Sequence, residues 1–343
     1  MTQRALRDFV GAKEVAQTEL DLIVWIPGVK VFASKTRSFM NGTIAPWVEG
    51  KLLADIHPEF LRGFHDCMGH GNINQGFYNS VFHLCMGLIQ GTPIKELNAD
   101  CEKYTRITDE YRVNQALSFT LLIWRPIRML TGKGDRTTND DILDVTGLYK
   151  STKKMRKSEG MKLIDLAFEA AAKMLLVTYG DNLEEDERSM GVMVKISDSM
   201  AAHFSTTYCS MTIALGCMVL YHKTSRQKYY RFHRKMVKEL EKYYKKKAPI
   251  AMAPYLLLVA MTMANKSQQK TWEDIQHAYL EAMEVARHHG DFVLAEAYGY
   301  EKLAKLAEAR SDGPKARFYL QEALVTYTRW GETFKMAELT ERL

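Results

Sequence analysis

Apolar residues recur along most of this chain at three- and four-residue intervals, with short Gly, Asp, Asn or Pro interruptions between the periodic segments. This spacing is typical of amphipathic α-helices, and we find no convincing alternation of the kind that marks a β-strand. Tyr78, Phe82 and Met86, for example, lie four residues apart on one face of a helix that we expect to end near Gly91. The pattern therefore predicts an all-α protein.

The same periodicity predicts a series of helices after that one. A helix should begin at Ile94, and Pro126 should kink or end the first part of a long helix over 111–130. We expect further helices over 161–179, within 183–199, and over 201–222, 226–246, 249–264, 272–289, 292–310 and 314–330. Because their connections are short, neighbouring helices should be antiparallel and form helical hairpins.

Two segments near the C-terminus repeat each other. Tyr279 recurs as Tyr319 after 40 residues, and Gly290 recurs as Gly331 after 41 residues. A period of this length is expected of solenoids built from helix pairs. Gly299 lies inside an otherwise strong helical segment, where glycine costs about 1 kcal/mol relative to alanine, so we expect the last two hairpins to touch there.

Length and composition agree with a folded array. The chain has 343 residues, of which 46% are hydrophobic and 26% charged. We predict a helical-hairpin region at 1–131, a charged linker or loop at 132–160, and a tetratricopeptide-like helical repeat region, an α-solenoid, at 161–343.

Targeting signals and cysteine usage point to the inside of the cell. No window approaches 18 uncharged apolar residues, and the first twenty residues fit neither a secretory signal nor a transit peptide. The five cysteines make an odd number and none lies in a C-x-x-C pair, which favours buried thiols in a reducing compartment. We expect an intracellular, cytoplasmic protein without a cofactor.

The last third of the chain carries a more specific motif. Its residues are Tyr319, Leu320, Ala323, Tyr327, Trp330, Gly331 and Lys335. This motif resembles the tetratricopeptide-like helical region that follows the ATPase module in very large serine/threonine kinase and hybrid histidine kinase sensor proteins. The resemblance is clearest over 229–343 and diffuse before it. It implies an interaction and coupling role, with other proteins or domains of a signalling assembly as partners, because in those proteins the helical array carries no chemistry of its own.

Positive charge is concentrated in one segment. The formal net charge of the chain is +6, yet residues 223–247 contain eleven Lys or Arg and two acidic residues. Phe232, Met236 and Leu240 recur four residues apart and predict a buried stripe, with the basic residues on the opposite face. The possible interaction surface comprises Arg231, Arg234, Lys235, Lys238, Lys242 and Tyr243.

That basic segment has three interpretations. It can be an ordinary solvated face, a surface for an acidic protein or an acidic membrane, or a nucleic-acid surface, for which the interleaved tyrosines would supply stacking. The solvated face is favoured over the acidic partner, and nucleic acid is the least favoured. Polyanion binding through 226–247 would weaken steeply with salt.

A metal site is the remaining chemical candidate. His65, Cys67 and His70 combine imidazole and thiolate groups, which suit zinc. Histidines five residues apart do not share a helix face, however, and no second half-site follows. We interpret these residues as the polar end of a helix, with Gly69 and Gly71 in a turn. The sequence thus favours a non-catalytic protein–protein interaction scaffold, with polyanion binding and a metal-dependent enzyme as alternatives.

Overall fold

The computed structural model describes residues 9–25, 36, 45–47, 53–132, 163–179, 205–265, 270–288 and 292–343. Within these ranges the chain forms thirteen α-helices and one short 3-10 helix, η2 (Ala45–Trp47), and has no strand. No helix in the described ranges has both the length and the apolar character needed to cross a membrane. The predicted all-α class is confirmed.

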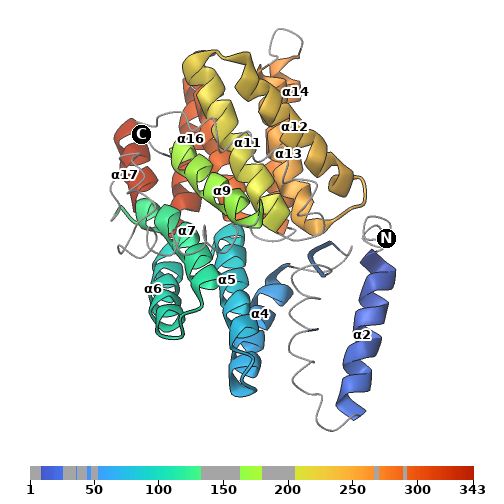
Figure 1. Ribbon diagram of the computed structural model, residues 1–343. Helices are drawn as coiled ribbons and strands as arrows, with labels where there is room; N and C mark the ends of the chain where they lie inside the picture. Colours follow the sequence, from blue (N-terminus) through green and yellow to red (C-terminus); the bar gives the residue numbers. More distant parts are fainter. Residues whose placement is uncertain are drawn as a thin grey trace.

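The helices follow one another with short connections from α4 to α7, and again from α11 to α17 (Figure 1). Their bounds are α2 (Phe9–Trp25), α4 (Leu53–Gly69), α5 (Ile73–Gln90), α6 (Ile94–Glu110), α7 (Asn114–Leu130), α9 (Leu163–Tyr179), α11 (Ser205–Thr224), α12 (Gln227–Tyr244), α13 (Pro249–Asn265), α14 (Trp272–His288), α15 (Val293–Glu308), α16 (Gly313–Trp330) and α17 (Thr333–Arg342). Neighbours in the chain pack as antiparallel pairs, as in α4/α5, α6/α7, α11/α12, α13/α14 and α15/α16. The stacked hairpins that the sequence predicted are therefore present.

Glycine and a capping carboxylate set the ends of two of these helices. Gly91 ends α5 and Gly331 ends α16, both with a left-handed backbone (φ 75° and 78°) that glycine adopts without steric cost. At the start of α16, the Asp312 side chain accepts a hydrogen bond from the backbone N–H of Lys315 at 3.2 Å. The predicted stop at Gly91 and the new helix at Ile94 are confirmed.

The prediction of a helix over 111–130, with a kink or an end at Pro126, needs correction at its start and as to the end. The helix expected over 111–130 begins only at Asn114, because Tyr111 to Val113 form a turn in which Arg112 has φ 56°. Pro126 does not end that helix, which continues to Leu130; it is buried with most of α7, and this packing offsets the backbone hydrogen bond that proline cannot make. Helix α17 was not predicted. The expected helix within 183–199 and nearly all of the expected linker at 132–160 lie outside the described residues.

The N-terminal hairpins pack against the C-terminal array. Helix α5 contacts α15, and α7 contacts both α9 and α17. One close approach is at Gly91, where an added Cβ atom would lie 2.2 Å from Cγ2 of Val293. Figure 1 shows α4 to α7 together below the larger group formed by α9 and α11 to α17. Helices α5 and α7 are thus in contact with helices of the C-terminal array.

The close approach predicted at Gly299 is confirmed. A Cβ atom on this residue would lie 2.9 Å from both Cγ and Sδ of Met283 in α14, and 3.6 Å from Cδ1 of Leu257 in α13. The hairpin α15/α16 therefore meets the hairpin α13/α14 where α15 has no side chain.

Candidate functional site

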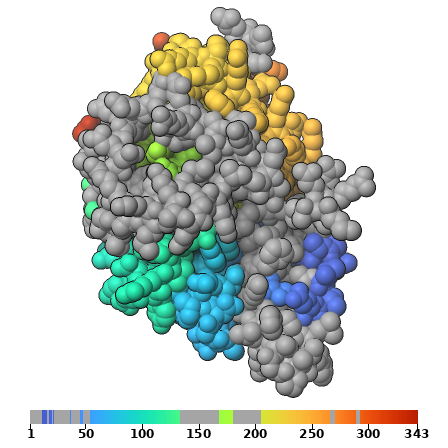
Figure 2. All heavy atoms as spheres, in the orientation of Figure 1, coloured from blue at the N-terminus to red at the C-terminus, as the bar shows by residue number. Residues whose placement is uncertain are grey.

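Helix α12 forms one edge of the array and packs against α11 and α13 (Figures 1 and 2). Five residues at alternating four- and three-residue spacing form its buried stripe: Tyr229, His233, Met236, Leu240 and Tyr243. This stripe is the apolar face that an amphipathic helix turns toward the core. The opposite face of α12 is left for solvent.

The buried stripe lies on a slightly different face of α12 from the one that the sequence predicted. Phe232, which we expected in the core, is only partly buried, whereas the neighbouring His233 is fully buried. Tyr243, which we expected on the interaction surface, is 8% exposed and belongs to the buried stripe. Tyr243 is therefore removed from the candidate surface.

His233 is buried because both of its ring nitrogens have partners. Its Nδ1 lies 3.0 Å from the backbone oxygen of Ala214 in α11, and its Nε2 lies 2.9 Å from the hydroxyl of Thr262 in α13. Burial lowers the pKa of His233 to about 4, against the effect of its backbone hydrogen bonds, so the ring is neutral at neutral pH. This histidine joins three helices and fixes which face of α12 points outward.

The cations expected on the surface are mostly exposed. Arg231, Lys235, Lys238 and Lys242 are exposed, and Arg234 is partly buried beside them. Each of these four exposed residues comes two positions after a residue of the buried stripe. Two positions correspond to about 200° of rotation around the helix axis, so the four lie on the side of α12 opposite the stripe. Space-filling spheres of α11 and α12 form the yellow to gold upper surface in Figure 2.

Carboxylates accompany only the C-terminal part of this surface. Glu239 forms an ion pair with Lys242, and Glu241 lies 2.8 Å from Lys245. Helix α12 contains no Asp or Glu before Glu239. Its N-terminal two thirds therefore contain basic residues and no acidic residue.

Two tyrosines on the flanks of α12 are already stacked on other rings. Tyr230 packs beside Tyr221 of α11, with ring centroids 5.3 Å apart. Tyr244 stacks on Tyr255 of α13 at 4.4 Å. The interleaved aromatic residues therefore hold the helices together, and they are not free platforms for nucleic-acid bases.

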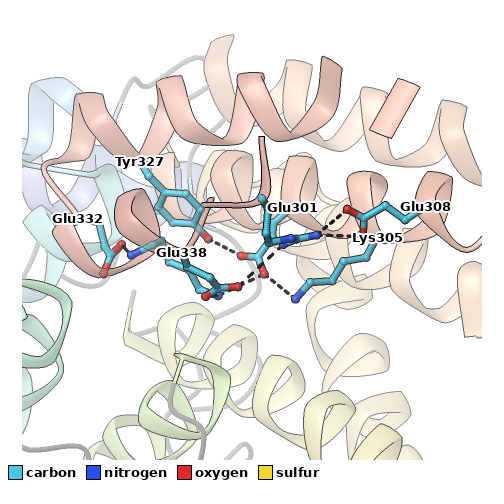
Figure 3. A network of polar contacts seen from close by, with 8 residues as sticks. Glu301, Lys305, Glu308, Tyr327, Glu332 and Glu338 are labelled. Carbon is cyan, nitrogen blue, oxygen red and sulfur yellow. Dashed lines mark hydrogen bonds and ion pairs between the residues drawn. The ribbon is translucent and has the colours of Figure 1, made fainter. Parts of the chain in front are cut away.

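A second group of charged residues surrounds the buried Glu301 at the C-terminal end of the array (Figure 3). The Glu301 carboxylate of α15 accepts hydrogen bonds from the Lys305 ammonium group at 2.8 Å, the Tyr327 hydroxyl at 3.1 Å and the Lys335 ammonium group at 3.3 Å. Lys335 also donates to Glu338 at 2.7 Å. We call this set, together with Glu332, the Glu301 network; it ties α17 to α15 and α16.

The surroundings of the Glu301 network shift two carboxyl groups in opposite directions. Burial alone would raise the pKa of Glu301, but the ammonium groups of Lys335 and Lys305 outweigh it and lower the pKa to about 2. Burial raises the pKa of Glu332 to about 8, even though the backbone N–H of Lys335 donates to its side chain. Glu301 is therefore ionised at neutral pH and Glu332 is mostly protonated.

A second buried carboxylate joins the last two hairpins. Glu296 in α15 is 1% exposed, and one of its oxygens lies 2.6 Å from Arg287 of α14. The other oxygen lies 2.6 Å from Arg329 of α16. Because both arginines reach it from neighbouring helices, the Glu296 carboxylate links three consecutive helices of the array.

The three residues of the candidate metal site do not converge. Cys67 is buried and accepts a hydrogen bond from Asn79 at 3.7 Å, whereas His65 and His70 are exposed. The ring of His70 binds the backbone oxygen of Asp66 at 2.7 Å, as expected of a residue just after a helix end. Among the described residues, no group of three His, Cys, Asp or Glu side chains is arranged to hold a metal ion.

Sequence analysis missed a histidine pair that the fold brings together. His57 of α4 stacks on His83 of α5 with ring centroids 4.4 Å apart, and its Nε2 lies 3.0 Å from the backbone oxygen of His83. His83 in turn lies 3.3 Å from the Asp100 carboxylate of α6. Burial, followed by the charge of His83, lowers the pKa of His57 to about 4. This cluster joins three helices, and no short sequence motif marks it because its members are spread over 44 positions.

Comparisons with known proteins assign no family to the chain. No protein-family model matches the sequence, and a search of curated proteins gave no significant match.

Proposed function

We propose that this chain is a non-catalytic scaffold that binds an acidic protein partner through the exposed cations of α12. One observation carries the proposal: Arg231, Lys235, Lys238 and Lys242 lie together on the outward face of the helix, directly opposite its buried stripe. Acidic residues in the same helix begin only at Glu239. A surface of this kind attracts and orients a partner of opposite charge.

The arrangement of charges on α12 is costly for the isolated helix, which supports a role outside folding. Like charges three or four residues apart destabilise a helix by about 0.2–0.5 kcal/mol per pair. Arg231 and Lys235 form such a pair, as do Lys235 and Lys238, and Lys238 and Lys242. Attraction between these cations and a bound acidic surface would offset the repulsion among them.

The partner fits best within a signalling assembly, as a region that couples protein domains. The resemblance to tetratricopeptide-like regions of large sensor kinases supports this part of the proposal, through Tyr327, Trp330 and Lys335 of the C-terminal motif. The spacing of the last hairpins agrees with it, because α16 begins 41 residues after α14 and α17 begins 40 residues after α15. In this role the helical array supplies position and contact, and chemistry belongs to a partner.

The test compares two variants that lose the same amount of charge. The first carries Arg231→Gln, Lys235→Gln and Lys238→Gln on α12. The matched control carries Lys95→Gln, Lys103→Gln and Arg106→Gln, which are also exposed but lie on α6. Proteins cross-linked to each form in its own cells are identified and quantified by mass spectrometry.

We expect one or more acidic signalling proteins to be captured by the native chain and by the α6 variant, and at least roughly tenfold less by the α12 variant. Equal capture by all three forms would refute the proposed surface. Recovery of RNA or acidic lipid in place of protein, lost in the α12 variant, would replace the proposal with polyanion binding.

A further inference from the structure

The exposed cations of α12 belong to a longer and more regular series. At alternating three- and four-residue steps, every position is basic: Lys228, Arg231, Lys235, Lys238, Lys242 and Lys245. All except the partly buried Lys228 are exposed, and the Lys242 and Lys245 side chains retain 60% and 69% of their accessible surface. We call this series the basic seam.

The period of the basic seam is informative. Steps of three and four residues average 3.5, close to the 3.6 residues of one helical turn, so the series drifts only about 20° per heptad. From Lys228 to Lys245 it extends for about 25 Å at 1.5 Å per residue. The cations therefore form a line nearly parallel to the axis of α12. Two helices that pack side by side contact each other along such a line.

The same face of α12 offers little to other kinds of polyanion. Apart from Gln227, its exposed positions are cationic, and none of the described residues with a large exposed apolar side chain lies in α12, so the helix has no anchor to insert into a lipid surface. Tyr230 and Tyr244 already stack on neighbouring rings, as described above. A line of exposed cations along the outward face of α12 thus favours a partner that is itself long, straight and acidic.

We propose that the basic seam binds an acidic α-helix of a partner protein, whose carboxylates repeat at the same three- and four-residue spacing. The inference rests on the proposed function, because it specifies the partner of the same surface. Each turn of such a helix places a carboxylate opposite an ammonium or guanidinium group of α12. The centre of the pairing is at Arg231, Lys235 and Lys238, which are exposed in the middle of the basic seam.

Three fluorescent peptides of about 21 residues, or three heptads, test this pairing. The first has Glu at every first and fourth heptad position and Ala or Gln elsewhere. The second has the same composition, with the Glu residues distributed around the helix. The third is the first peptide with a central proline, which breaks the helix. Binding of each to the complete chain is measured by fluorescence anisotropy, with RNA homopolymer and phosphatidylserine vesicles as competitors.

We expect the first peptide to bind roughly tenfold more tightly than the other two. Its affinity should fall roughly tenfold in the Arg231→Gln, Lys235→Gln and Lys238→Gln variant and stay unchanged in the α6 control variant. Equal affinity for all three peptides would overturn the inference, because it would show a response to net charge alone. The inference would also be overturned if vesicles or RNA displaced the first peptide at a lower concentration of negative charges than the unlabelled peptide requires.

Failure of this inference and failure of the proposed function are distinguishable. If the peptides bind equally but capture of a cellular protein still depends on α12, the scaffold proposal stands and its partner is not a helix with patterned charge. If cellular capture does not depend on α12, the proposed function itself fails.

Discussion

The basic seam of α12 and the Glu301 network contain the same kinds of charged residue in opposite circumstances. Lys335 in the network has a side chain only 8% exposed and is held between Glu301 and Glu338. On α12, Lys238 is exposed, and the helix has no carboxylate before Glu239. The charges of the network are used inside the fold, whereas those of α12 are directed outward. The contrast separates charges held within the fold from charges on its surface.

Removing the central carboxylate of the network should have the largest effect on stability. Glu301→Gln keeps the size of the side chain but leaves the buried Lys335 without its main counter-charge, and breaking a buried pair typically costs about 3–5 kcal/mol. We expect a loss near the lower end, because Lys335 retains Glu338. Urea denaturation followed by circular dichroism measures it. The control is Glu308→Gln, whose exposed pairing with Arg342 contributes less than about 1 kcal/mol.

A packing variant in α15 separates shape from charge in the same region. Gly299→Leu inserts a side chain where even a Cβ atom would meet Met283 at 2.9 Å, and we expect a loss of about 1–3 kcal/mol from overpacking. Thermal unfolding measures it. An unchanged melting temperature would contradict the close contact. Gly313→Ala is the control, because nothing lies within 4 Å of the position of its added Cβ atom.

Titration of Glu332 should give a smaller effect that depends on pH. Burial raises its pKa in the folded protein from 4.5 to about 8, so between these values the folded state keeps a proton that the unfolded state releases. The contribution to stability is therefore present below pH 4.5 and is lost as pH rises to about 8.

Denaturation at several pH values tests this assignment. Relative to the native chain, Glu332→Gln should gain about 1–3 kcal/mol of stability between about pH 5 and pH 8, because glutamine stays neutral. Parallel stability profiles for the two proteins over this range would show that Glu332 is not the titrating group.

Neutralising the basic seam should have the smallest effect on stability, with the opposite sign to the effect at Glu301. The variant with Arg231→Gln, Lys235→Gln and Lys238→Gln removes the four like-charge steps of the seam between Lys228 and Lys242, and we expect it to gain up to about 1 kcal/mol at low salt. The gain should disappear at high ionic strength, where exposed charges are screened. A clear loss of stability would show that these cations stabilise the folded protein, as the Glu301 network does, and would contradict the contrast between the two regions.

Periodicity alone was enough to predict the fold class and most helices of the described chain. The bounds of α13, α14 and α16 lie within one residue of the expected ones, because long apolar stripes ended by Gly or Pro leave few alternatives. Helix α17 was missed, since it has only ten residues and begins at Glu332, which is a less common capping residue than Ser or Asp.

The details of the sites depended on contacts that sequence spacing does not contain. On α12, hydrophobicity favoured Phe232 over His233 for the core, but Ala214 and Thr262 provide hydrogen-bond partners that make a buried histidine stable. In the Glu301 network, Tyr327 and Lys335 belong to the motif on which the resemblance was based, whereas the sequence analysis did not single out Glu301. Besides Lys305 of the same helix, its partners come from other helices, 26 and 34 positions further along the chain.

The contact between Gly91 and Val293 has a consequence for the order of folding. The hairpins α4/α5 and α6/α7 are made of local contacts and can form as soon as they leave the ribosome. The end of α5, however, packs against a residue synthesised about 200 positions later, which takes roughly 10–40 s at ordinary translation rates. We therefore expect the apolar surface around Gly91 to be a binding site for chaperones during synthesis, occupied until α15 arrives to replace them.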